Sequence, residues 1–179
     1  MIRTMIRAAM LRADAYEEVE ANKSATGQAM AIVVLVSIAT GIGYTGLTTA
    51  TGQEATSWSL IGIVMGVAAS LLGWALLAWI TFIVGAKLLP SAETEANWGE
   101  LARTLGFAQT AGILKIGGLI PGIGPFLFTF GSLMVLMATF IAIRQALDYT
   151  STLRAVAVGV ISYIPYVIIM LLAISLIGG

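Results

Sequence analysis

Long apolar runs, separated by short polar or Gly/Pro-rich breaks, dominate the pattern of this 179-residue chain. An α-helix rises about 1.5 Å per residue, so about 20 apolar residues cross the hydrocarbon core of a bilayer. The runs that meet this length are residues 27–49, 58–86, 125–147 and 155–177. The pattern therefore predicts an all-α membrane protein in which these four runs are transmembrane helices.

A fifth run, residues 101–120, is shorter and contains Gln109 and Lys115. It predicts a full span or a re-entrant segment, and the full span is the preferred interpretation, giving five transmembrane helices. The sequence PGIGP follows the run and favours a turn over continued helix. Residues 97–148 then form a membrane hairpin whose two ends return to one surface. The turn residues are Pro121, Gly122, Gly124 and Pro125.

The first 22 residues predict an amphipathic helix, because apolar side chains recur every three or four positions from Ile2 to Tyr16. One interpretation places this helix in the membrane interface, with its basic half near lipid phosphates. The other packs its apolar stripe on the bundle, and the interfacial placement is preferred. Residues 1–26 then form a cytoplasmic amphipathic helix and linker, and residues 27–179 form a five-helix transmembrane domain.

Composition agrees with lipid as the solvent, since 59% of the residues are hydrophobic and only 10% are charged. Soluble domains average about 25% charged residues. Nine basic and nine acidic residues cancel, so the net charge does not indicate a nucleic-acid partner. The chain has no Cys and no His, which removes thiolate and imidazole ligands and the commonest general base. We therefore expect no metal site and no cofactor of its own, although bound lipid fits the composition.

The distribution of basic residues predicts how the chain is oriented in the membrane. With five spans, eight of the nine Lys and Arg residues fall on one side, and only Lys115 falls on the other. Because the cytoplasmic side carries the basic excess, the N-terminus is expected in the cytoplasm and the C-terminus outside. The eight are Arg3, Arg7, Arg12, Lys23, Lys87, Arg103, Arg144 and Arg154.

Polar residues near the cytoplasmic ends of the hairpin form a candidate site. Arg144 and Asp148 stand one helical turn apart and can pair, and the hairpin brings Arg103 to the same surface. The cluster predicts a docking or gating surface, or alternatively a salt-bridged helix end that seals the bundle. The acidic half of the N-terminal helix is a second surface for a partner. The candidate residues are Asp14, Tyr16, Glu17, Glu18, Arg103, Gln109, Arg144, Gln145 and Asp148.

Small residues at four-residue spacing predict close helix packing, since they let helix backbones approach each other in lipid. Gly41, Gly43 and Gly46 also match a dinucleotide-binding pattern, but no strand precedes them, so we interpret them as packing residues. Such ridges could equally contact another subunit. The two other ridges are Gly62, Gly66 and Ser70 on one run, and Ala138, Ala142 and Ala146 on another.

Several blocks of the sequence resemble bacterial members of the YIP-domain family of Ypt/Rab-interacting membrane proteins. They are residues 11–29, RTLGFAQ at 103–109, IPGIGP at 120–125 and the segment 141–161 that contains IRQALDY. The resemblance implies a cytoplasmic N-terminal segment followed by about five spans, in a bacterial cytoplasmic membrane. Eukaryotic relatives are tied to Rab GTPases and vesicle traffic, but their N-terminal signature is not visible here, so Rab binding is not carried over. The resemblance implies a fold and a topology and leaves function open.

No residues have the pattern of a nucleophile with its base, and no carboxylate lies within a span. The leading hypothesis is therefore a non-catalytic scaffold or accessory subunit that binds lipids or other integral membrane proteins, as part of a larger complex. The second is a small transporter or channel with Gln109 and Lys115 along its path. The third is a membrane-shaping protein that acts through its amphipathic helix.

Overall fold

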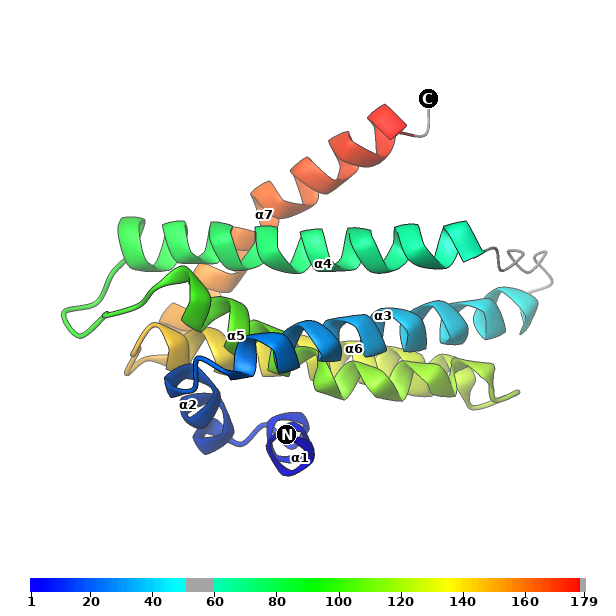
Figure 1. Cartoon of the computed structure of the whole chain (residues 1–179), viewed down its shortest axis with the longest axis horizontal. Helices are drawn as coiled ribbons and strands as arrows, with labels where there is room; N and C mark the ends of the chain where they lie inside the picture. The colour runs from blue at the N-terminus through cyan, green and yellow to red at the C-terminus, as the bar shows by residue number, and fades with distance from the viewer. Residues whose placement is uncertain (51–59, 178–179) are drawn as a thin grey trace.

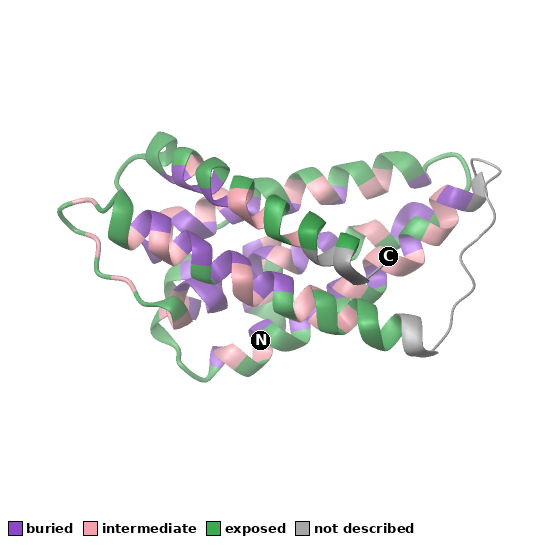
Figure 2. Cartoon of the chain, turned by 90° about the horizontal axis from the view of Figure 1, so that it is seen from above, coloured by how far each residue is buried: buried purple, intermediate pink, exposed green. Residues whose placement is uncertain are grey.

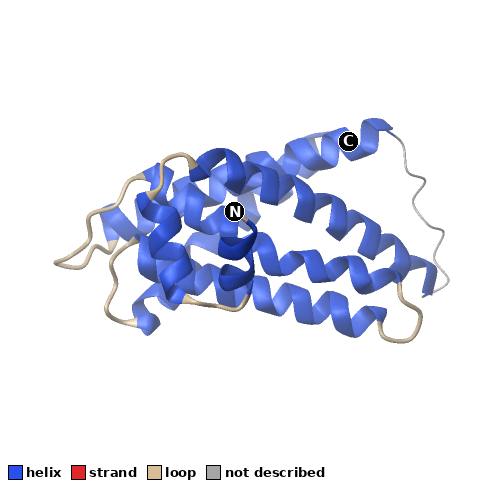
Figure 3. Ribbon diagram, turned by 60° about the horizontal axis from the view of Figure 1, so that its bottom comes forward, coloured by secondary structure: helices blue, strands red, loops and turns tan. Residues whose placement is uncertain are grey.

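The computed structural model describes residues 1–50 and 60–177, and all regular structure within those ranges is helical (Figure 1). The elements are α1 (Ile2–Ala9), α2 (Ala13–Ala21), α3 (Ala25–Ala50), α4 (Leu60–Phe82), the π-helix η1 (Ile83–Leu88), α5 (Trp98–Ala108), the 3-10 helix η2 (Gln109–Leu119), α6 (Gly124–Ala146) and α7 (Thr152–Ile177). Short loops join them, and the longest described loop is residues 89–97 (Figure 3). Helix α7 leaves the bundle at an angle, as Figure 1 shows.

Four helices in the described ranges are long and apolar enough to cross a membrane, which fits a membrane protein. They cover Ala25–Thr48, Ile63–Leu88, Gly124–Ala146 and Thr152–Leu172, and they match the four long apolar runs of the sequence. The fifth predicted span has another form, because α5 continues directly into the 3-10 helix η2 instead of forming one long α-helix.

The segment formed by α5 and η2 lies at the centre of the bundle. Helix η2 packs between α3 and α6, while α5 contacts α2, α3, α4 and α6. Every residue of α5 from Leu101 to Ala108 is buried. In Figure 1 the segment starts at the end of the bundle where α4 finishes, and α6 starts at the opposite end. At the turn between them Gly122 has a φ of +82°, and Pro125 stands in the first turn of α6.

Glycines bring the backbones of α3, η2 and the start of α6 into direct contact. A Cβ placed on Gly46 would lie 2.5 Å from the carbonyl oxygen of Gly118, and a Cβ on Gly124 would lie equally close to that oxygen. A Cβ on Gly43 would overlap the carbonyl group of Lys115. These contacts are the close packing that the glycine spacing of α3 predicts.

The prediction of one N-terminal helix is wrong, because the structure has two helices with a break at residues 10–12. Leu11 has a φ of +62° there, a left-handed conformation that ends α1 and redirects the chain. Figure 1 shows α1 nearly end-on, so its axis crosses the direction of the long helices. Thr4 and Ala8 are its buried residues and face the protein.

Apolar side chains cover the outward faces of α4 and α7. Leu72 is 72% exposed and Leu171 is 61% exposed, although both belong to helices with almost no charge. Buried residues gather inside the bundle, while the outer helix faces are exposed (Figure 2). Water disfavours such a surface and lipid favours it, so the pattern of exposure agrees with the four membrane-length helices.

Candidate functional site

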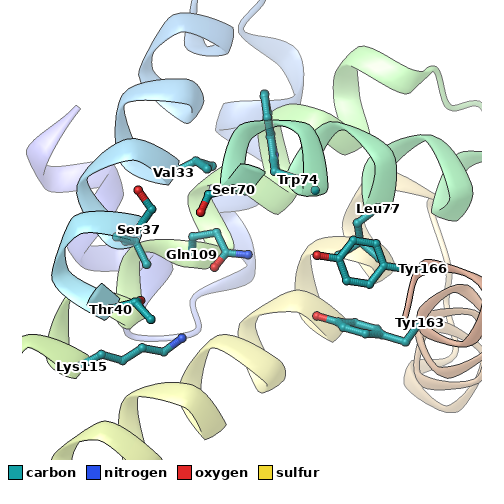
Figure 4. Close-up of a pocket in the computed structure, with 12 residues that line it drawn as sticks. Val33, Ser37, Thr40, Ser70, Trp74, Leu77, Gln109, Lys115, Tyr163 and Tyr166 are labelled. Atoms are coloured by element: carbon teal, nitrogen blue, oxygen red, sulfur yellow. The ribbon is translucent and has the colours of Figure 1, made fainter. Parts of the chain in front are cut away.

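A polar cavity of about 270 Å³ lies between α3, α4, η2 and α7 (Figure 4). Hydroxyl, amide and ammonium groups share its walls with aliphatic and aromatic side chains, although these helices are mainly apolar. The structure thereby brings together Gln109 and Lys115, the two polar residues that distinguish the fifth apolar run. The lining residues are Val33, Val36, Ser37, Thr40, Ser70, Gly73, Trp74, Leu77, Gln109, Lys115, Tyr163 and Tyr166.

Three donors of the cavity wall are already satisfied by the protein. The hydroxyls of Ser37 and Ser70 each donate to a carbonyl oxygen of their own helix at 2.8 Å. The indole N–H of Trp74 donates to the carbonyl oxygen of Ala102 on α5 at 2.9 Å. These donors are therefore not free for a ligand, and the Trp74 bond also joins α4 to α5.

Other polar groups of the wall have no hydrogen-bond partner within the described ranges, namely the Lys115 ammonium, the Gln109 amide and the Tyr166 hydroxyl. No described acidic side chain lies within 4.0 Å of Lys115, whose ammonium is 5.8 Å from the centre of the Phe128 ring. Figure 4 shows the ammonium, the amide and the tyrosine hydroxyls around one space. An uncompensated cation beside unused donors is suited to hold an acceptor group.

A second polar region, the α2 junction, lies where the end of α2 meets the start of α5 and the end of α6. Its centre is Arg103, which is only 6% exposed. The Arg103 guanidinium donates to the carbonyl oxygens of Val19 at 3.3 Å and Glu20 at 2.6 Å. These are terminal carbonyls of α2, so a buried cation caps the negative end of that helix.

Acidic residues of α2 contact the opposite side of the same junction. The Gln145 amide donates to a Glu17 carboxylate oxygen at 2.7 Å. Burial, together with the charges of Asp148 and Glu100, raises the pKa of Glu20 to about 7 against the opposing charge of Arg103. The junction therefore holds a carboxyl group that titrates near neutral pH.

The predicted ion pair between Arg144 and Asp148 is not formed, since no N–O distance within 4.0 Å joins these two described residues. The Arg144 guanidinium instead donates to the carbonyl oxygens of Tyr149 and Thr150, both at 3.1 Å. Asp148 has a φ of +50°, which turns the chain after α6 and brings those carbonyls within reach of Arg144. Arg144 thus holds the loop between α6 and α7 against the end of its own helix.

Charged residues also tie α1 to α2. The Arg7 guanidinium bonds a carboxylate oxygen of Asp14 at 2.7 Å and one of Glu18 at 2.6 Å. The buried Tyr16 hydroxyl donates to the Ala8 carbonyl oxygen at 2.9 Å, and burial raises the pKa of this tyrosine. The acidic candidate residues of α2 are therefore used inside the chain.

The predicted site residues thus divide between four places. Arg103, Gln145 and Glu17 meet at the α2 junction, and Asp148 lies close enough to influence Glu20 there. Asp14, Tyr16 and Glu18 hold α1 on α2, while Arg144 binds the loop that follows α6. Gln109 is separate from these and lines the cavity.

The two small-residue ridges differ in the structure. Ala138, Ala142 and Ala146 are 0% exposed and pack inside the bundle. A Cβ placed on Gly66 would meet no atom within 4 Å, so this part of the α4 ridge makes no close contact within the described chain. Ser70 of the same ridge lines the cavity.

Some site residues were not found by sequence reasoning. Tyr163 and Tyr166 of α7 line the cavity, and Tyr149 places its hydroxyl 2.9 Å from the Gly85 carbonyl oxygen and 2.7 Å from that of Leu89. The available signal for the cavity was the presence of polar side chains inside runs that are otherwise apolar. That signal does not say which of these side chains share a face.

An apolar pocket of about 320 Å³ lies between α1 and η2. Ile2, Met5 and Ile6 of α1 form one wall, and Ile113 and Leu114 of η2 form the other. Its lining is almost entirely apolar, so the chemistry it offers is that of a hydrocarbon chain. The cavity and this pocket therefore present opposite chemistries on the two sides of η2.

Known protein families, curated proteins and solved structures give no match to this chain. The resemblance to the YIP-domain family therefore stays a prediction.

Proposed function

We propose that this chain is a non-catalytic, five-pass membrane protein that engages lipid through α1 and serves as a scaffold or accessory protein for other membrane components. The observation that carries the proposal is the exposure of α1. Ile2 is 72% exposed, Ile6 is 55% exposed and Met10 is 67% exposed, although they lie beside a bundle that buries other apolar residues. Lipid is the environment in which this row of side chains is favourable.

The polar contacts of α1 support this placement. Arg7 binds the carboxylates of Asp14 and Glu18, which holds the polar side of α1 against α2. The apolar residues that remain outward continue into the apolar pocket shared with η2. An interfacial helix that crosses the direction of the membrane helices, with an acyl-chain pocket along its flank, is suited to bind lipid.

Three features support a fifth crossing by α5 and η2. An 11-residue α-helix extends about 16 Å and an 11-residue 3-10 helix about 22 Å, so together they exceed the roughly 30 Å hydrocarbon core. The segment joins opposite ends of the bundle in Figure 1. Eight of the nine basic residues then lie on one side, which favours a cytoplasmic N-terminus and an external C-terminus.

A depth measurement tests the role of α1. The chain contains no cysteine, so Ile6→Cys supplies one labelling site for an environment-sensitive fluorophore in lipid vesicles. We expect nitroxide-labelled lipids to quench this probe strongly, whereas a probe at Glu93→Cys, in the exposed loop 89–97, should be quenched weakly. Equal weak quenching at both positions would place α1 in water and remove the basis of the proposal.

The scaffold role has its own test. Gly66 lies on an exposed part of α4, where a Cβ would meet no atom of the described chain. We expect the chain to purify in mild detergent with a stoichiometric membrane-protein partner, and Gly66→Trp to reduce that association. Recovery of the chain alone, at the mass of one copy with lipid, would count against a scaffold.

Solute transport is a second candidate function, favoured by the polar cavity that contains Gln109 and Lys115. Purified chain in liposomes would then conduct a small solute, and Lys115→Leu would reduce the flux. No flux above empty liposomes for anions, cations or neutral solutes would argue against this function and leave the lipid-binding role of α1 untouched.

A further inference from the structure

We propose that the polar cavity binds a small organic monocarboxylate, with the ligand carboxylate on Lys115 and its apolar body against the cavity wall. This inference goes beyond the lipid-binding role of α1. It also concerns binding alone, so it can hold whether or not the chain moves a solute across the membrane. Charge, donor inventory and wall chemistry each support it.

The charge of Lys115 supports an anionic ligand, because a cation inside an apolar bundle needs a partner. Lys115 is the one ionisable residue of Lys, Arg, Asp or Glu type among the twelve that line the cavity. Its ammonium lies 5.8 Å from the centre of the Phe128 ring, and no described carboxylate lies within 4.0 Å. A bound anion supplies the missing charge.

The hydrogen-bonding groups also select an acceptor. The hydroxyls of Ser37 and Ser70 and the indole of Trp74 already donate to backbone carbonyls. The Lys115 ammonium and the Gln109 amide can still donate, and both extend into the same space in Figure 4. A carboxylate has two oxygens and no donor, so it can accept from both groups at once.

The walls distinguish a monocarboxylate from a phosphate. One lysine balances one negative charge, and no arginine lines the cavity to bind a divalent oxyanion through two parallel bonds. Val33, Leu77 and the ring of Trp74 offer an apolar surface opposite the charged group. A ligand with one carboxylate and a compact hydrocarbon or aromatic body fits both halves of the site.

The backbone that carries Lys115 is held rigidly, as a binding residue requires. Gly43 of α3 packs directly on the carbonyl group of Lys115. On the other side, a Cβ placed on Gly131 of α6 would lie 3.3 Å from the Lys115 amide nitrogen. The ammonium is therefore presented from a fixed position between two helices, which lowers the cost of ordering the site around a ligand.

Binding to purified full-length chain in lipid nanodiscs tests the proposal, with benzoate as the probe. Benzylammonium and benzyl alcohol are matched probes, since they carry a similar ring with a positive charge or no charge. We expect calorimetry to detect benzoate and to show at least about tenfold weaker binding of both matched probes, because one charge-assisted contact is lost. Inorganic phosphate and chloride should bind more weakly than benzoate.

Variants locate the site. Lys115→Gln should weaken benzoate binding at least about tenfold, and Lys115→Arg should restore most of it. Lys87→Gln is the matched control, since Lys87 also lies over a phenylalanine ring, at 5.7 Å from the centre of Phe82, but does not line the cavity. This control should bind benzoate like the unaltered chain.

Competition with dodecanoate distinguishes a membrane source of the carboxylate from a water-soluble one. If dodecanoate displaces benzoate and binds more tightly, the carboxylate comes from a fatty acid in the bilayer; if it does not, the ligand is water-soluble. The proposal is overturned if benzoate and dodecanoate both fail to bind, if benzylammonium binds as well as benzoate, or if Lys115→Gln binds benzoate unchanged. The probe comparison on the unaltered chain decides the matter even if a variant misfolds.

Discussion

The two ends of this helical bundle are stabilised by different interactions. At the α2 junction and its surroundings, arginine side chains donate to helix-end carbonyls, as Arg103 does to Val19 and Glu20. At the opposite end, glycines such as Gly43 and Gly46 let the backbones of α3 and η2 touch without side chains between them. Charged groups need water nearby, whereas backbone contact through glycine works in lipid.

The difference separates an end held by charged groups from an end packed through glycine. Ion pairs and capping arginines at one end remain favourable where solvent compensates their unused hydrogen-bonding groups. Close glycine packing gains dispersion energy without desolvating a charge, so it suits the uncharged end. The backbone of Lys115 takes part in the glycine contacts, but its ammonium has no charged partner among the described residues, so the cavity stands out as a ligand site.

The largest expected effect is a loss of stability when Arg103 is replaced at the charged end. Arg103→Met removes two charge-assisted bonds to carbonyls in the last turn of α2, of which Val19 keeps one bond from the Asn22 amide, so we expect a loss of about 3 kcal/mol in the free energy of unfolding. Unfolding of the purified chain in mixed micelles measures it. Arg103→Lys should lose about half as much, because lysine keeps the charge but not the planar fork. A loss below about 0.5 kcal/mol for the methionine variant would show that the cap contributes little.

The next largest effect is a loss of stability when Gly43 is replaced at the glycine end. Gly43→Ala places a methyl group on the Lys115 carbonyl, and because backbone cannot move aside easily we expect a loss of about 2 kcal/mol. Gly66→Ala is the control, since a Cβ there meets nothing within 4 Å and alanine favours the helix. Equal stability of the two variants in the same unfolding assay would contradict the glycine contact.

Removing a single hydroxyl group, that of Tyr149, should have a smaller effect on stability. Tyr149→Phe leaves the carbonyls of buried Gly85 and exposed Leu89 without this donor, so a loss of about 1 kcal/mol is expected. Tyr166→Phe removes a hydroxyl that has no hydrogen-bond partner among the described residues and should leave stability nearly unchanged. If the two tyrosine variants unfold alike, the Tyr149 hydroxyl does not connect the loop 89–97 to the end of α6.

Acidity should affect the charged end alone. The folded-state pKa of Glu20 is about 7, above its ordinary value of 4.5, so the folded state holds the proton more tightly. The stabilisation this provides is complete below about pH 4.5 and is lost as pH rises through about 7. Hydrogen exchange of α2 amides should therefore speed up between about pH 6 and 8, after correction for intrinsic exchange rates. Glu20→Gln should remove this dependence; a variant with an unchanged profile would assign the effect to another group.

The smallest effect concerns the side chain of Lys115. Lys115→Met should leave stability unchanged or slightly higher without ligand, because no described partner is orphaned and an apolar side chain suits the bundle. The same assay used for Arg103→Met measures it. A large loss would mean that Lys115 supports the fold, and the case for a ligand at its ammonium would weaken.

Sequence pattern predicts the four long membrane helices and the glycine packing of α3, because these depend on apolar length and residue size. It does not predict the break at Leu11, since no Gly or Pro marks it and the left-handed turn is stabilised by contacts between α1 and α2. It also missed the bonding of Arg144, because a pair at four-residue spacing was expected while Asp148 leaves the helix. Helical spacing rules fail where the helix itself ends.

The sequence pointed to only some of the residues that line the cavity. Gln109 and Lys115 stood out because each is polar within an apolar run, and the structure places both in one wall. Tyr163 and Tyr166 come from another helix, and which faces of α7 and η2 meet depends on the packing of the whole bundle. Register between helices is a tertiary property that one sequence does not encode locally.

The crossing of α5 and η2 is the central claim, and labelling tests it most directly. Glu93→Cys and Ile123→Cys each place one cysteine in a chain that has none, in the two loops that flank this segment. A membrane-impermeant maleimide applied to one side of sealed membranes should label one position and reach the other only after permeabilisation. Labelling of both positions from the same side would contradict a fifth crossing and the orientation built on it.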